Sequence, residues 1–473
     1  MGVWLLGIAV AAADPLVLSY AEALERGLAH NPTIAMADQD LRAADGALLA
    51  ARGVFDPNLE ATLGLQSSTS EGSGQLGEYS AKARTAYNSA AVSWLAPTGT
   101  TLSLGWDNSR NDYRYVLANF DQPYSDAQFG SGLRATVSQA LLEGWRMSYN
   151  LAAVRQATQN HDLAEIAAQS ARQQTLADVA SAYWTLWYTR KQVAIAESAV
   201  GVAEEESRIV RARVEAGALA QVERSRADAL VVEAQSALIT ARNAARAASD
   251  DLLLLLGETP GADVTLNTEP AEPAPLSLDE AALVSTALER NPDLAALRLA
   301  EDAATQDQRD TVHARLPQLD ASASYGLTGY DPTLSGSISE MASGDFPEWS
   351  VGASLSLPLG NRIARGQAMA ADAGLTQARL EREAYERTLT ALIRAQVATL
   401  ESASSQLQLA QANARLADET LAAERALQSV GRAVQRDVLD AIKGADTARL
   451  AVEKARADYA LAVVQLEQLK GTL

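Results

Sequence analysis

Side chains able to bind a cation or catalyse a reaction are scarce in this chain of 473 residues. Asp437 and Asp440 are the clearest pair, because a three-residue spacing places both carboxylates on one face of a helix. There is no cysteine, and the three histidines, His30, His161 and His313, show no metal-ligand spacing. The sequence also has no glycine-rich phosphate loop and no credible nucleophile–base pair, so we expect no enzyme, no cofactor and no metal site.

Composition and charge narrow the class of protein further. The net charge of −20 argues against a nucleic acid partner, since phosphate binding requires a basic surface. Aromatic residues make up only 5% of the chain, and its abundant small side chains favour close packing of helices. Beyond the N-terminus, no stretch approaches the roughly 20 apolar residues of a membrane-spanning helix. A chain of this kind would cross a membrane only as a closed β-barrel.

The N-terminal residues 1–13 resemble a secretory signal. An apolar run from Val3 to Val10 ends in three alanines before Asp14, which suits the apolar region and the small-residue cleavage site of such a segment. A basic region before the apolar run is missing, and an ordinary buried segment is the alternative. We expect the repeated part of the chain to begin at residue 14.

The chain consists of two copies of one unit. Three landmarks of the first half recur in the second, namely Asn31-Pro32 as Asn291-Pro292, Gly217 as Gly431, and Gly257 as Gly471. The first recurrence has an offset of 260 residues and the others an offset of 214, so the first copy holds 260 − 214 = 46 extra residues in its middle. We expect a first repeat over residues 14–257, a proline-rich linker over 258–277, and a second repeat over 278–473.

Each repeat combines helices with strands. Two helices are separated by the Asn-Pro pair, and then apolar and small polar residues alternate with a period of two, which is typical of strands. A long helix follows, roughly 100 Å in length, with small apolar residues at the heptad spacing of a coiled coil. It ends at a tip glycine, Gly217 or Gly431, where a return helix begins. The expected ranges are strands over about 59–142 and 318–358, long helices over about 149–216 and 363–430, and return helices over 222–256 and 434–470.

The strands cannot form a free-standing sheet, because an isolated hairpin is marginally stable. Their alternating faces suit a barrel wall with apolar side chains toward lipid and small polar side chains toward a lumen. Four strands per chain would need three chains to close a barrel of about 12 strands, and six per chain would give about 18. The 46 extra residues leave open whether the first repeat contains a long loop or an additional hairpin.

The expected fold is therefore mostly α with a β-barrel part. Two tandem helix–strand–strand–helix repeats would form, as a trimer, a transmembrane β-barrel of about 12 strands, continued by a long α-helical barrel. Barrel wall and helical tube would share one symmetry axis.

Three segments give the chain a resemblance to the TolC-like outer membrane efflux protein family, over about residues 16–473. They are LLEGWRMSYN at 141–150, LPLGNRIARGQ at 357–367, and SVGRAVQRDVLDA at 429–441, which resembles the helix-hairpin tip of that family. The resemblance implies a homotrimer in the outer membrane of a Gram-negative bacterium, with its helices in the periplasm. It implies a passive exit duct of a tripartite efflux pump or type I secretion system. The partners would be a periplasmic adaptor (membrane fusion) protein, which opens the tips, and an inner-membrane RND or ABC transporter.

The resemblance also gives the carboxylate pair a role. Three-fold symmetry would bring Asp437 and Asp440 into a pore selectivity ring that favours cations. A solvated pair on the outer face of the helix is the alternative. The first-repeat counterparts are Glu223 and Arg226, so the ring would be asymmetric.

Two further groups of residues are candidates. The adaptor would dock on the hairpin tips, whose glycines are turn formers in any case; these residues are Gly217, Ala218, Leu219, Val430, Gly431 and Arg432. Aromatic side chains at the membrane interface, or ordinary strand packing, would account for Trp94, Trp106, Trp145 and Trp349.

Three other classes of protein compete with the duct. A soluble coiled-coil scaffold explains the helices but neither the period-two segments nor the signal-like start. An enzyme would need the catalytic groups that the sequence lacks. An ion-selective porin without pump partners would not need helices of roughly 100 Å.

Overall fold

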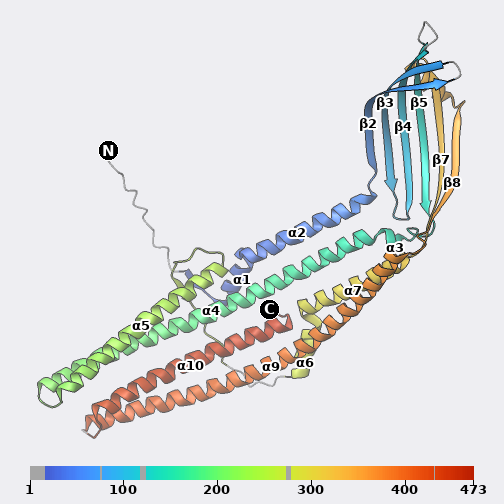
Figure 1. Ribbon diagram of the computed structural model, residues 1–473. Coiled ribbons are helices and arrows are strands. Elements are labelled where there is room, and N and C mark those ends of the chain that lie inside the picture. Colours follow the sequence, from blue (N-terminus) through green and yellow to red (C-terminus); the bar gives the residue numbers. More distant parts are fainter. Residues whose placement is uncertain (1–15, 75–76, 118–123, 273–278, 431) are drawn as a thin grey trace, which may run out of the picture. The chain divides into compact units, whose positions relative to one another are not determined.

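The computed structural model describes residues 16–74, 77–117, 124–272, 279–430 and 432–473 (Figure 1). The signal-like residues 1–13, the tip glycine Gly431 and residues 273–277 of the expected linker lie outside the described residues. Two compact units are formed. The helical unit comprises the chain up to Leu41, Leu163–Arg298 and Glu381–Leu473, and the sheet unit comprises Arg42–Asp162 and Leu299–Leu380. Each unit takes segments from both repeats, so units and repeats do not coincide.

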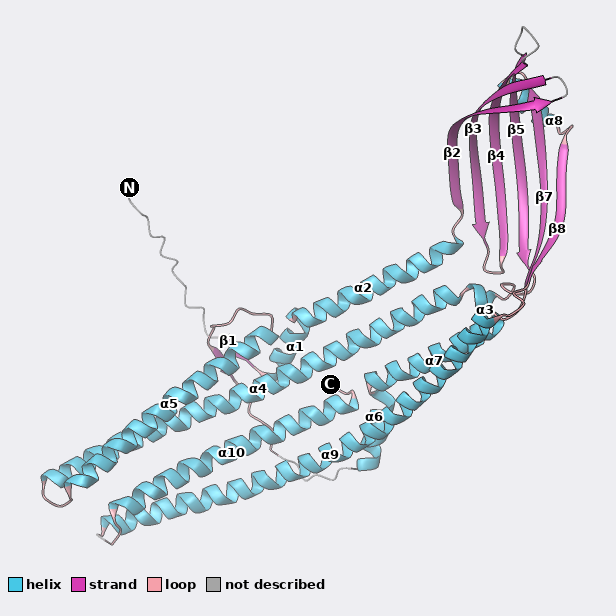
Figure 2. Cartoon of the chain, in the orientation of Figure 1, coloured by secondary structure: helices cyan, strands magenta, loops and turns pink. Residues whose placement is uncertain are grey.

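The sheet unit is built on six antiparallel strands in the order β2-β3-β4-β5-β7-β8 (Figure 2). Their bounds are β2 Asn58–Gly74, β3 Gly77–Leu95, β4 Thr100–Leu117, β5 Tyr124–Ala140, β7 Gln318–Asp331 and β8 Pro347–Ser356. The repeats meet where β5 pairs with β7, with Ala135 opposite Tyr325. Within the described residues, no helix combines the length and apolar character needed to cross a bilayer.

The first repeat contributes four strands to the sheet and the second contributes two. Of the two alternatives left open for the first repeat, a long loop or an additional hairpin, the structure contains the additional hairpin. The fold with two strands in each repeat, and with it the figure of about 12 strands, is therefore corrected to six strands per chain. Beyond the apolar rows, β2 to β5 are rich in serine, glycine and charged residues, which weakens the apolar period that marks a strand in the sequence. The extra residues of the first repeat thus belong to strands and not to a long loop.

A short helix, α8 (Leu334–Ser343), interrupts the expected strand region between β7 and β8. The hydroxyl of Thr333 caps its first turn by accepting a hydrogen bond from the backbone N–H of Gly336, and Gly344 ends it in a left-handed conformation. The helix lies against Gly329 so closely that a Cβ there would stand 2.2 Å from the carbonyl oxygen of Ser337. Glycine at this position therefore permits the contact.

The sheet has two chemically different faces. One row of cross-strand neighbours is largely apolar, and it consists of Leu59, Val92, Leu104, Ala135, Tyr325 and Trp349. The row one residue away is small and polar, and it consists of Asn58, Ser93, Ser103, Thr136, Ser324 and Ser350. Because successive side chains point to opposite faces, these rows define an apolar face and a polar face.

The helical unit contains two antiparallel helix hairpins, one from each repeat (Figure 1). Helices α2, α4, α7 and α9 contribute residues to both units. The first repeat supplies α1 Tyr20–His30, α2 Pro32–Arg52, α4 Ala152–Glu215 and α5 Gln221–Leu255. The short η1 Gly53–Phe55 follows α2, and the short α3 Met147–Asn150 precedes α4. The second supplies α6 Glu280–Arg290, α7 Pro292–His313, α9 Arg362–Ser429 and α10 Gln435–Lys470.

Part of the expected linker is a strand. β6 (Val264–Leu266) pairs in parallel with β1 (Leu16–Leu18). Beside them, the buried Tyr183 hydroxyl donates to the carbonyl oxygen of Leu18 at 3.3 Å and accepts from the backbone N–H of Thr268 at 3.2 Å. Its ring makes edge contacts with Tyr20 and Trp184, with centroids 5.5 and 5.1 Å away. This aromatic group is a packed core.

An asparagine joins the helices of each repeat. Asn31 accepts a hydrogen bond from the backbone N–H of Thr33 at 2.8 Å, which caps α2, and its amide donates to the carbonyl oxygen of Leu255 at the end of α5, also at 2.8 Å. Asn291 repeats this arrangement in the second repeat, with the carbonyl oxygen of Leu469 at 3.2 Å. The Asn-Pro pair is thus both a helix start and a contact to the return helix.

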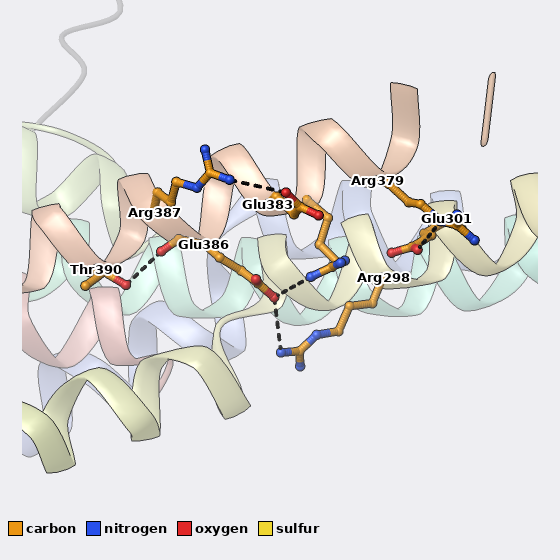
Figure 3. Close-up of polar contacts among 8 residues, drawn as sticks. Arg298, Glu301, Arg379, Glu383, Glu386, Arg387 and Thr390 are labelled. Carbon is orange, nitrogen blue, oxygen red and sulfur yellow. Dashed lines mark hydrogen bonds and ion pairs between the residues drawn. The ribbon is translucent and has the colours of Figure 1, made fainter. Parts of the chain in front are cut away.

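The second joint has additional support from α9. The hydroxyl of Tyr385 donates to Asp293 at 3.1 Å and to Asn291 at 3.3 Å. Burial, reinforced by the charge of Asp293, raises the pKa of Tyr385 to about 12. The neighbouring Glu386 accepts from Arg382 at 2.9 Å and lies 3.9 Å from Arg298 of α7 (Figure 3). These contacts hold α7 against α9 within the helical unit.

A glycine completes each joint. After α5, Gly257 and Glu258 donate backbone hydrogen bonds to Leu254 and Leu253, the pattern of a glycine helix stop. A Cβ on Gly257 would stand 2.4 Å from the carbonyl oxygen of His30. In the second repeat, a Cβ on Gly471 would stand 2.5 Å from the carbonyl oxygen of Arg290. The return helix therefore abuts the end of the first helix in both repeats.

Two glycine substitutions should separate backbone strain from close packing. Gly257 and Gly217 have similar positive φ values of 73° and 77°, but a Cβ on Gly217 meets nothing within 4 Å. We expect Gly217→Ala to cost about 1–2 kcal/mol of unfolding free energy through strain alone. Gly257→Ala should cost clearly more, as measured by chemical denaturation followed by circular dichroism. Equal losses would show that the joint yields readily to a methyl group.

Candidate functional site

The tips of the two helix hairpins end on the same kind of turn. At the first tip, Gly217 donates to the carbonyl oxygen of Val214 at 2.9 Å and Ala218 donates to that of Arg213 at 2.8 Å. At the second tip, Arg432 donates to the carbonyl oxygen of Leu427 at 2.9 Å, which is the equivalent bond around residue 431. Both long helices thus stop through satisfied backbone groups.

The side chains at both tips face solvent within this chain. Ala218 and Arg432 are exposed, and Leu219 is half-buried. Valines close to the tips are exposed despite being apolar, with Val430 at 67% and Val434 at 65%. Apolar side chains left in water at a helix turn favour contact with a partner surface.

The carboxylate pair lies just after the second tip, in the first turns of α10. Asp437 and Asp440 are both exposed, whereas Val438 between them is buried against the hairpin interior. Asp440 lies 3.5 Å from the guanidinium of Arg436. Within the described residues, no cation lies at ion-pair distance from Asp437. The structure thus brings the pair to one solvent-facing side of α10, with one carboxylate partly neutralised.

The first tip differs in charge at the equivalent positions. Arg226 donates to Glu223 at 2.7 Å, so the two side chains form a local ion pair. The predicted asymmetry between the tips is therefore an asymmetry between a paired and a partly unpaired set of charges.

A polar contact closes the first hairpin a few turns below its tip. Asp228 of α5 accepts from the hydroxyl of Ser207 at 2.7 Å and from Arg211 at 2.7 Å, both on α4. The Ser207 hydroxyl, together with Arg211, lowers the pKa of the Asp228 carboxyl. In the second repeat, at an offset of 214, Leu421 and Ile442 stand in place of Ser207 and Asp228 and pack in an apolar cluster. No sequence motif predicts the Asp228 contact, but a position-by-position alignment of the two repeats reveals this difference.

Of the four tryptophans that were predicted to lie at the membrane interface, three are on the apolar face of the sheet. Trp94 lies opposite Leu102, Trp106 opposite Ala90, and Trp349 opposite Tyr325. The indole N–H of Trp94 donates to the carbonyl oxygen of Phe55 at 2.9 Å. The three tryptophans lie in three successive cross-strand rows of the apolar face. Trp145 follows β5 and lies outside the strands.

Both outer strands of the sheet are unpaired along one edge. Every residue of β8 is exposed, including Trp349 at 75%. On β2, at the opposite edge, Leu63 and Leu65 are exposed at 85% and 89%. An exposed apolar edge strand is a template for pairing with another chain.

The family described as "Outer membrane efflux protein" matches this chain in two segments, residues 23–258 and 283–472. The first segment covers most of the first repeat and the second covers most of the second. The chain is 28% identical over 245 residues to the outer membrane protein TolC of Escherichia coli K12, covering 50% of this chain and 48% of TolC. It is 26% identical over 373 residues to the outer membrane efflux protein BepC of Brucella suis biovar 1, covering 76% of each chain.

Solved structures share the fold. VceC of Vibrio cholerae superposes with a TM-score of 0.66 at 18% identity, covering 96% of each chain. The outer-membrane channel OprN superposes with a TM-score of 0.71 at 17% identity, covering 96% of this chain and 90% of that one. The family consists of channel proteins, which agrees with the expectation that the chain is not an enzyme. The chain belongs to the outer membrane efflux protein family and is a protein of the Gram-negative outer membrane with a periplasmic helical part.

Proposed function

We propose that the protein is the passive exit duct of an efflux or secretion machine, formed by three copies of the chain. The main support is the sheet, whose two exposed edges run in opposite directions because six strands alternate from β2 to β8. The outer edge of β8 in one copy can therefore pair with β2 of the next in antiparallel fashion. Three copies of six strands would close a barrel of about 18 strands, an even number as such barrels require.

The apolar face of the sheet is about as tall as the apolar band of an outer-membrane barrel. On β8 it carries Leu355, Ala353, Val351, Trp349 and Pro347, which are two residues apart along the strand. At roughly 3.3 Å per residue, these eight steps span about 26 Å, and the apolar band of outer-membrane barrels is about 25 Å tall. The polar face, lined by serine, threonine and glycine, would surround a watery lumen.

Electron microscopy of the detergent-extracted protein tests this proposal directly. We expect elongated three-fold particles with one end in detergent, and stepwise conductance when the particles are added to planar lipid bilayers. Closure requires the outer edge of β8, so proline at an outward-facing N–H of that strand should prevent trimers while leaving monomers. Compact particles found only in the soluble fraction would contradict the proposal.

The exposed tips would receive a periplasmic adaptor (membrane fusion) protein, which would couple the duct to an inner-membrane transporter of the RND or ABC class. The exposed apolar residues Val430 and Val434 beside Arg432 support such a docking surface. Contact with the adaptor would move the tips apart and open the duct. The same arrangement would serve efflux or type I secretion.

Bulky side chains at the tips should block export without preventing assembly. We expect Ala218→Trp and Arg432→Trp to abolish survival on a compound to which deletion of the gene sensitises the cells. Ile239→Trp, at a position on α5 exposed at 62% and away from the tip, is the matched control and should leave survival unchanged. Normal survival of both tip variants, with normal trimer levels, would rule out docking at these residues.

Asp437 and Asp440 would form the selectivity ring of the periplasmic end. Carboxylates around a pore favour cations, and Asp437 has no ion-pair partner among the described residues. We expect Asp437→Asn combined with Asp440→Asn to lower the cation-to-anion permeability ratio several-fold, measured as reversal potential under a salt gradient. Glu223→Gln should change the ratio less, because Arg226 already pairs with that carboxylate. An unchanged ratio in the double variant would place the pair outside the pore.

A further inference from the structure

A cavity of about 570 Å³ lies in the helical unit, between α4 and α5 at the end of the first hairpin that is away from its tip. It is bounded by α4 near Arg190, by α5 near Arg246, and by the loop that follows α5 near Asp263. Apolar walls come from Val193 and Ala245. The cavity is distant in sequence from the tip residues and involves none of the strands of the sheet unit.

The acidic groups of this cavity already have hydrogen-bond donors. The pairs are Asp263 with Arg190 at 2.6 Å, Glu197 with Arg242 at 2.8 Å, and Asp250 with the backbone N–H of Gly261 at 2.9 Å. Each carboxylate of the cavity therefore already accepts at least one hydrogen bond, and two of the three are paired with an arginine.

The unused polar groups are donors. Ser249 is 93% buried, at 7% exposure, and its hydroxyl has no hydrogen-bond partner among the described residues. The Nε–H of Arg190 is likewise buried and without a partner. Arg246 lies on the same face of α5, three residues before Ser249; its side chain is exposed and forms no ion pair with any described residue. Buried donors without partners cost stability, so their presence around a cavity indicates an acceptor that comes from outside the chain.

The second repeat shows that the fold does not require these groups. At the offset of 214 residues, Arg246 corresponds to Ala460, Ser249 to Val463, and Arg190 to Ser404. Ala460 is buried in the apolar core of the unit. Both arginines are thus replaced in the second repeat by smaller side chains and Ser249 by valine, so two of the three replacements are apolar.

We propose that this cavity binds the carboxylate of a small organic monoanion. The guanidinium of Arg246 would hold the carboxylate, since its planar fork matches the two oxygens, and Ser249 would donate a further hydrogen bond. The apolar part of the ligand would lie against Val193 and Ala245. Three arginines and three carboxylates line the cavity, so Arg246 supplies the local positive charge for one carboxylate, and a second negative charge on the ligand would meet the carboxylates of the lining.

Isothermal titration calorimetry of the purified full-length protein with benzoate tests the proposal, with benzamide as the neutral ligand of the same shape. We expect saturable binding of benzoate at one site per chain and no binding of benzamide. Arg246→Gln should weaken benzoate binding roughly tenfold or more, because it removes a charge-assisted hydrogen bond. Equal binding of the two ligands, or no binding of benzoate, would overturn the proposal.

Two further variants separate the site from general effects of charge and folding. Arg246→Ala combined with Ser249→Val installs the residues of the second repeat, so the hairpin should fold normally, checked by circular dichroism, and lose benzoate binding. Arg387→Gln removes an exposed arginine of α9 that pairs with Glu383, and it should keep the wild-type affinity. A loss of affinity in Arg387→Gln equal to that in Arg246→Gln would show a non-specific charge effect and refute the site.

Discussion

The helical unit depends on two asparagine side chains, each of which ties the end of a return helix to the start of another helix. Asn31 and Asn291 use both ends of their amide, one as a helix cap and the other as a donor to a carbonyl oxygen that its own helix leaves unsatisfied. Aspartate would lose the donor and serine would lose the reach. A glycine follows each return helix and leaves room for the backbone of the first helix. Hydrogen bonds and close backbone packing therefore both hold the joint. A single short motif thereby aligns helices that are more than 170 residues apart.

The sheet differs from the helical unit, because within one chain it neither pairs all of its backbone groups nor covers its apolar side chains. Its central strands are fully paired, yet β2 and β8 each keep an open edge and the apolar face has no protein layer over most of its area. The small helix α8 covers only the row in which Ser131, buried at 3% exposure, bonds to Asn108 and Ser337. Within one chain, then, the helical unit has a core of its own, whereas the sheet leaves its two edges and most of its apolar side chains exposed.

The helix hairpins could be predicted from the sequence because glycine, proline and asparagine occur where helices begin and end. The family was predicted from the resemblance of three segments, and the family match confirms it. Sequence reasoning missed three kinds of feature. β2 to β5 are 17 to 19 residues long, and beyond the apolar rows they are rich in serine, glycine and charged residues, so backbone pairing defines their full length better than a side-chain pattern does. β1 and β6 are three residues each, too short for any period. The Asp228 contact and the cavity around Arg246 arise from residues distant in sequence, and only a comparison of the two repeats brings them into view.

In both hairpins the same number of residues separates the glycine at the tip from the glycine at the joint. Gly217 and Gly257 are 257 − 217 = 40 residues apart, and Gly431 and Gly471 are 471 − 431 = 40 residues apart. Since each second glycine is fixed at a joint, the two tips are set at matching distances from their joints by residue count alone. Inserting one heptad into a single return helix would advance that tip by about 10 Å relative to the other. A matching insertion in both return helices would keep the two tips at equal distances from their joints, so hairpin length is a property that the two repeats share although their sequences differ.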